Sequence, residues 1–139
     1  MRIWHKSLIP VLPREQLIAQ WRELSAIAGA IKKNGTPNHL LVNFVLDYDY
    51  DHFINYAAAV QYEMYSRGYH PSDAVWKKIE SLKPDWNPMG IENIYPEKMN
   101  DLYLKICYYN LYEKYLCGGI EQNWWNLIDD KVMTYERSK

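Results

Sequence analysis

This sequence of 139 residues predicts an all-α fold. Apolar residues recur at helical spacing through its longest regular segment, and proline and glycine residues stand where helices begin and end. Only residues 40–46 fit a short extended or helical piece, and nothing else alternates like a strand. The chain has the length of one domain with one hydrophobic core. We therefore expect residues 1–139 to form a compact single helical domain.

The first helix, predicted over residues 14–33, is the most clearly marked. Pro13 precedes it, Gly35 follows it, and Lys32 and Lys33 in its last turn complement the helix dipole. One side carries a continuous apolar stripe: Leu17, Trp21, Leu24, Ala28 and Ile31, with Ile27 beside it. The opposite side carries small residues: Ala19, Ala26, Gly29 and Ala30. This pattern predicts a central helix whose small-residue side is approached closely by another backbone or by a ligand.

The later helices are marked by capping residues, prolines and glycines. Asp49 or Asp51 begins the second, and Ser72 begins the third, which is short. Pro96 opens a long helix, and the glycine pair after Cys117 ends it. The predicted ranges are 49–67, 72–83, 97–117 and, for a short C-terminal helix, 120–135.

Composition excludes several classes of protein. No apolar run approaches the ~20 residues that cross a bilayer, and the first six residues are too polar for a signal peptide. Cys107 and Cys117 lie in one predicted helix, about 15 Å apart along its axis, which is too far for a disulfide. We therefore expect a reduced, cytoplasmic protein with no membrane partner. The histidines are scattered and no glycine-rich phosphate loop is present, so neither metal nor cofactor is expected.

Positive charge gathers at the start of the chain. The formal charge is −1 overall, but residues 1–39 carry a net +4 and residues 40–139 a net −5. A polyanion is expected to meet the first third, although such imbalance also occurs on ordinary solvated surfaces. Arg22 and Glu23 interrupt the small-residue side of the first helix. They indicate either a functional pair on a partly buried face or two charges on an exposed one.

The same region resembles one enzyme family. The chain begins Met-Arg-Ile (1–3), and Trp-Arg-Glu-Leu (21–24) is followed by Gly-Ala-Ile-Lys-Lys (29–33). This block is similar to that of the pyrimidine-dimer DNA glycosylase/AP lyase family, typified by the phage ultraviolet endonuclease. Weaker similarities follow at Ser-Arg-Gly-Tyr (66–69) and Tyr-Pro-Glu (95–97).

The resemblance implies a DNA repair enzyme that removes damaged bases and cuts the strand, on damaged double-stranded DNA carrying pyrimidine dimers or abasic sites. In that family the nucleophile is the α-amine of the first residue. Because Arg2 is large, we expect the initiator methionine to be retained, so the amine belongs to Met1. Chain-terminal amines ordinarily have a pKa of about 7.7–8.0, which leaves an appreciable neutral fraction near pH 7. The resemblance also implies that Glu23 is the catalytic carboxylate, and that Arg22 and Arg2 hold phosphates beside the lesion.

Two further pairs are expected to contact DNA. Lys32 and Lys33 would attract phosphates, and Trp124 and Trp125 would stack on opened DNA, although dipole complementation and packing explain these pairs equally. The chain departs from the family in two ways. It is slightly acidic where the phage member is basic, and Ser-Ala (25–26) replaces an arginine one turn beyond the motif. These departures leave open which lesion the protein would act on.

Two other functions fit the same residues. A non-catalytic helical module would bind protein through its tyrosine and tryptophan side chains, and a nucleic-acid binder without catalysis would use the basic first third. Only the enzyme requires the amine of Met1 to lie beside Glu23.

Overall fold

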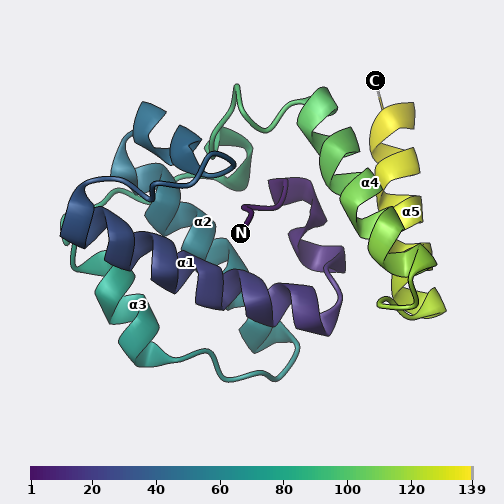
Figure 1. Ribbon diagram of the computed structural model, residues 1–139, viewed down its shortest axis with the longest axis horizontal. Helices are drawn as coiled ribbons and strands as arrows, with labels where there is room; N and C mark the ends of the chain where they lie inside the picture. The colour runs from purple at the N-terminus through teal and green to yellow at the C-terminus, as the bar shows by residue number, and fades with distance from the viewer. Residues whose placement is uncertain (139) are drawn as a thin grey trace.

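The computed structural model describes residues 1–138, and their regular structure is entirely helical (Figure 1). Five α-helices and three short 3₁₀ helices (η) follow in the order η1 (Lys6–Val11), α1 (Arg14–Asn34), η2 (Asn43–Asp47), α2 (Tyr50–Ser66), α3 (Asp73–Glu80), η3 (Ile91–Asn93), α4 (Asp101–Leu116) and α5 (Gln122–Arg137). The predicted all-α class is therefore confirmed.

The helix α1 has the predicted extent and the predicted buried side. Gly35 ends it with a left-handed backbone at φ 76°, which glycine adopts without steric cost. The buried side is Leu17, Gln20, Trp21, Leu24, Ile27 and Ala28. The small-residue side is approached by a side chain of α3: a methyl group added at Gly29 would lie 2.9 Å from Nζ of Lys78. That ammonium donates a hydrogen bond to Oγ of Ser25 at 3.2 Å.

The capping residues behave as predicted, with one shift in extent. The Asp49 side chain accepts from the Asp51 amide at the start of α2, and the Ser72 hydroxyl accepts from the Val75 amide at the start of α3. The helix α3 ends at Glu80 rather than near residue 83.

Three other elements differ from the prediction. The helix α4 begins at Asp101 rather than at residue 97, because the Asn100 side chain caps it by accepting from the Tyr103 amide at 2.9 Å. The C-terminal helix α5, predicted as short over 120–135, lies two residues later and equals α4 in length. For residues 40–46 the helical alternative is confirmed, since 43–46 belong to the 3₁₀ helix η2. The helix η1 was not predicted, because Pro10 within it hides any periodic signal.

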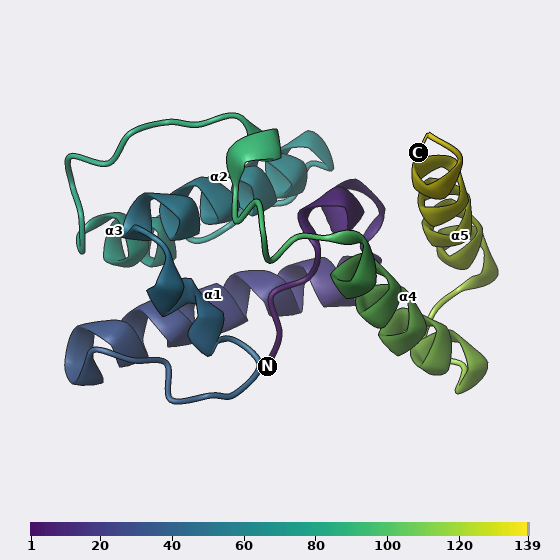
Figure 2. The same cartoon turned by 90° about the horizontal axis from the view of Figure 1, so that it is seen from above.

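The elements form two groups with the start of the chain between them. The helices α1, α2 and α3 pack together, and α4 and α5 lie side by side opposite them (Figures 1 and 2). The N-terminal segment and η1 run between these groups and contact both α2 and α5. Three side chains there are completely buried: Ile3, Leu8 and Leu12. The start of the chain is therefore part of the core.

None of the helices within residues 1–138 combines the length and apolar character that crossing a membrane requires.

Candidate active site

A glutamine of α1 fixes the first residues of the chain. The side chain of Gln20 is fully buried, accepts a hydrogen bond from the Trp4 amide at 2.9 Å and donates one to the Arg2 carbonyl at 2.9 Å. The Tyr56 hydroxyl lies 3.0 Å from the same Gln20 oxygen and 2.7 Å from the Trp4 carbonyl oxygen. Burial raises the pKa of Tyr56 well above its usual value, so this hydroxyl keeps its proton.

A second tyrosine holds the same segment from α4. The hydroxyl of Tyr103 donates to the Ile3 carbonyl, and burial raises the pKa of this tyrosine too. Three successive residues, 2 to 4, are thus held by side chains from α1, α2 and α4. Backbone groups that are buried and paired in this way do not fray, so the first residues have a fixed path.

This path brings the chain terminus to Glu23. The amide of Arg2 donates a hydrogen bond to Oε2 of Glu23 at 3.3 Å. Because neighbouring backbone nitrogens are at most about 3.7 Å apart, the amine of Met1 lies within about 7 Å of that oxygen. Met1 itself is 43% exposed, and Glu23 is half-buried.

A pocket of about 440 Å³ opens at this point, a size typical of ligand sites. Met1 and Arg2 line it together with Arg22 and Glu23, and α4 contributes Lys114 on another side. Ala19, from the small-residue side of α1, and Leu41, from the loop after α1, complete much of the wall. The amine of Met1, three cationic side chains and two carboxylates, those of Glu15 and Glu23, therefore surround one opening. The excess of positive charge suits a ligand that carries phosphate groups.

The sequence comparison agrees with this geometry. A family model described as pyrimidine dimer DNA glycosylase matches residues 1–77. The chain belongs to this glycosylase family. The match runs from the terminus through α1 and α2 into α3, so it contains Met1, Arg2, Arg22 and Glu23. No curated protein and no solved structure matches the chain. The family is described as a DNA glycosylase, so DNA is the substrate class that the match indicates.

Arg22 and Glu23 differ in exposure although they are neighbours. Arg22 is exposed at the pocket, whereas Glu23 is half-buried and already accepts a hydrogen bond from the main chain. An exposed arginine and a half-buried, hydrogen-bonded carboxylate suit different tasks, since phosphate contacts tolerate motion and proton transfer requires fixed geometry.

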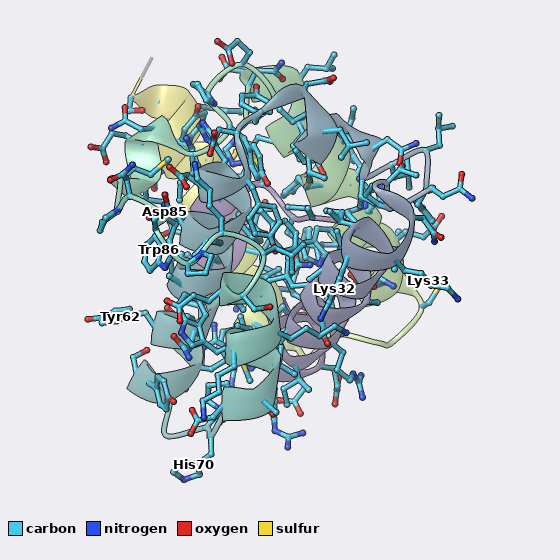
Figure 3. The ribbon with its side chains drawn as sticks, turned by 90° about the vertical axis from the view of Figure 1, so that its left-hand side faces the viewer. Lys32, Lys33, Tyr62, His70, Asp85 and Trp86 are labelled. Atoms are coloured by element: carbon cyan, nitrogen blue, oxygen red, sulfur yellow. The ribbon has the colours of Figure 1, made fainter. Side chains whose placement is uncertain are left out.

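Lys32 and Lys33 lie away from the pocket. Both are exposed near the end of α1 (Figure 3). Lys32 lies nine residues beyond Glu23, or about 14 Å along the helix axis. Neither lysine lines the pocket, so any phosphate they attract would lie away from it.

The structure does not bring Trp124 and Trp125 to the pocket either. Trp125 is buried, and its ring stacks on that of Tyr115 at a centroid distance of 5.0 Å. Trp124 is half-buried beneath the Arg67 guanidinium, 4.6 Å from the ring centroid. Stacking of this pair on DNA stays a prediction, and the geometry of the pocket does not use it.

Several pocket residues escaped the sequence analysis. Asn110 and Lys114 come from α4, which no local pattern connects to the first helix. Gln20 did carry a signal, because it is the one polar residue inside the apolar stripe of α1. A buried amide in that place needs partners, and the N-terminal main chain supplies them.

His5 lies near the terminus but faces a different hollow, of about 910 Å³, between η1, the start of α4 and α5. Its Nδ1 accepts from the Ser7 amide at 3.1 Å, and its ring packs near those of Tyr103 and Tyr135. Burial lowers the pKa of His5 to about 4, so the ring is neutral at pH 7. We assign it a packing and capping role.

The two cysteines, Cys107 and Cys117, are unpaired thiols, as predicted. Within residues 1–138, no three potential ligands among histidine, cysteine, aspartate and glutamate come close enough to share a metal ion.

Proposed function

We propose that this member of the glycosylase family removes a damaged base and then cuts the strand, through an imine formed by the amine of Met1. The observation that carries the proposal is the 3.3 Å hydrogen bond between the Arg2 amide and Glu23, which brings the terminus to a carboxylate. The amine needs no metal and no cofactor to act as a nucleophile towards a sugar carbon.

The reaction proceeds in two stages. The neutral amine of Met1 attacks C1′ of the damaged nucleotide, the glycosidic bond breaks, and the base leaves with a proton. The C1′–O4′ bond then breaks, O4′ takes up a proton, and the nitrogen, left with a single proton, forms a protonated C1′ imine that accepts electrons in the next step. A base then removes a proton from C2′, the C3′–O bond breaks and the 3′ phosphate leaves. Water finally hydrolyses the imine and restores the amine.

Glu23 is proposed to handle the protons and the positive charge. Its carboxylate would stabilise the cationic sugar as the base departs, then take up and return protons during imine formation and elimination. Its half-buried position strengthens both effects, because electrostatic interactions are weaker in bulk water. Arg2 and Arg22, joined by Lys114, would hold phosphates on either side of the lesion.

Borohydride trapping tests this proposal. Borohydride reduces the imine to a stable amine, so wild-type protein mixed with DNA containing an abasic site should give a covalent adduct that peptide mass analysis places on Met1. Glu23→Gln should lower the trapping rate by about a hundredfold or more, in the range of a lost acid–base group. Glu136→Gln, an exposed residue on α5, is the matched control and should trap normally.

The same assay identifies the alternatives. Absence of any adduct, with either abasic or dimer-containing duplexes, would contradict the imine mechanism. Salt-dependent binding in that case would indicate a nucleic-acid binder without catalysis. An adduct on a lysine rather than on Met1 would also contradict the proposal.

A further inference from the structure

The loop between α1 and η2 places two consecutive leucines at the edge of the pocket. Leu41 lines the pocket together with Met1 and is 46% exposed, and its neighbour Leu40 is 90% exposed. Figure 2 shows this loop passing beside the N terminus after it leaves the end of α1. The most exposed large apolar side chain among the described residues is therefore one residue away from a pocket wall.

The turn that carries these leucines is held in place. The amide of His39 donates to Oδ1 of Asn43 at 2.9 Å, and Nδ1 of His39 lies 3.3 Å from the amide of Leu41, which donates to it. The amide of Val42 donates to the His39 carbonyl at 3.0 Å, and the Val42 side chain is completely buried. The buried Val42 side chain and the hydrogen-bonded amides therefore fix the conformation of this turn. The exposure of Leu40 does not result from a loose chain.

An apolar side chain held in water gains the full hydrophobic effect only when it meets an apolar surface. Single exposed leucines are common and by themselves indicate nothing. Here, however, the cations Arg2, Arg22 and Lys114 stand at the same opening and suit phosphates. On a duplex held there by its phosphates, the only large apolar surfaces are the faces of the bases, which become accessible when a step is opened.

We propose that Leu40 and Leu41 form an apolar wedge that enters the base stack next to the lesion. The inference rests on the proposed function, because an amine can reach C1′ in a duplex only if the stack is distorted and the nucleotide leaves its place. The wedge fills the gap, and so lowers the free energy of the opened duplex relative to the closed one. It is a positioning element and touches no reacting atom.

A fluorescence measurement tests the wedge without any catalysis. The probe is a duplex with a tetrahydrofuran analogue of an abasic site, which cannot form an imine, and with 2-aminopurine beside it. Unstacking of 2-aminopurine raises its fluorescence. Wild-type protein should produce this rise at saturation, and Leu40→Ala should reduce it several-fold. Leu127→Ala is the matched control, because Leu127 is 50% exposed on α5 and does not line the pocket.

Cleavage rates supply the second readout. In single turnover on an abasic duplex, Leu40→Ala should be slower by about tenfold, the effect of losing most of one leucine's apolar contact. On the same abasic strand without its complement there is no stack to open, so the variant should match wild type. Leu127→Ala should match wild type on both substrates.

The outcomes separate the two proposals. If wild type forms no adduct on abasic DNA, either duplex or single-stranded, the imine mechanism fails, and the fluorescence result alone decides the wedge. If adducts form but Leu40→Ala leaves fluorescence and duplex cleavage unchanged, the wedge is wrong and the mechanism stands. Equal slowing on duplex and single-stranded DNA would mean that Leu40 supports the pocket itself, which also overturns the wedge.

Discussion

Replacing Gln20 by methionine should loosen the attachment of the start of the chain to the first helix. Methionine has nearly the same volume and length, so no cavity opens, but it can neither accept from the Trp4 amide nor donate to the Arg2 carbonyl. The Tyr56 hydroxyl keeps its bond to the Trp4 carbonyl. The substitution therefore isolates the polar contribution of a single side chain.

The expected loss of stability follows from the groups left behind. A buried backbone donor or acceptor without a partner costs about 1–3 kcal/mol. Two such groups are created, the Trp4 amide and the Arg2 carbonyl, and the second lies closer to solvent. We expect a loss of about 3 kcal/mol, which lowers the melting temperature of a chain of this size by on the order of 10 °C.

Urea unfolding and borohydride trapping together check this reasoning. Gln61→Met, on a half-buried glutamine of α2, is the control and should cost less than about 1 kcal/mol. At a temperature where both variants are folded, Gln20→Met should trap abasic DNA at least tenfold more slowly, because only the Arg2 amide then ties this segment to α1 and the amine is less firmly placed near Glu23. If Gln20→Met is as stable as the control, or traps at the wild-type rate, the side chain does not position the terminus.

Two further predictions concern stability. His5 has a pKa of about 4 in the folded protein against 6.5 for the ordinary side chain, so only the unfolded chain binds the proton between these values. Stability should therefore fall as the pH drops from about 6.5 to about 4, by up to about 3 kcal/mol, and His5→Asn should remove this component from urea unfolding across that range. Gly29→Ala should stabilise the protein by about 0.5–1 kcal/mol, since helices favour alanine and the ammonium of Lys78, 2.9 Å from the added methyl, ends a flexible side chain that can swing aside. A lowered melting temperature in Gly29→Ala would mean that Lys78 cannot move.

Helices whose signals are local were predictable, and those set by tertiary contacts were not. The helix α1 has Gly35 at its end and an apolar stripe along it, and both signals lie within the segment itself. The start of α4 depends on Asn100 and on Tyr95, a fully buried residue with positive φ, so Pro96 misled the prediction by four residues. The burial of Tyr95 depends on tertiary contacts, so it cannot be predicted from a short stretch of sequence.

The residues of the candidate site also fall into two groups, those that the local sequence indicates and those that only folding brings to the pocket. Glu23 and Arg22 were found because the motif that contains them is continuous. Lys114 and Leu41 were not, because α4 and the loop after α1 reach the pocket only through folding. Arg67, by contrast, was noted in the sequence but does not line the pocket. Its Nη1 donates to the Leu12 carbonyl at 2.8 Å and its Nε to Glu63 at 2.7 Å, so Arg67 connects α2 to the segment between η1 and α1.

The position of the amine results from two polar side chains on one face of α1. Gln20 and Glu23 are three residues apart, which makes them neighbours on the helix surface, and they bind the amides of Trp4 and Arg2 respectively. The start of the chain therefore runs along α1 in the opposite direction, which carries the terminus towards Glu23. A leucine in place of Gln20 would complete the apolar stripe, but it would leave this register unspecified. The buried glutamine therefore contributes more to positioning the start of the chain than to packing of the hydrophobic core.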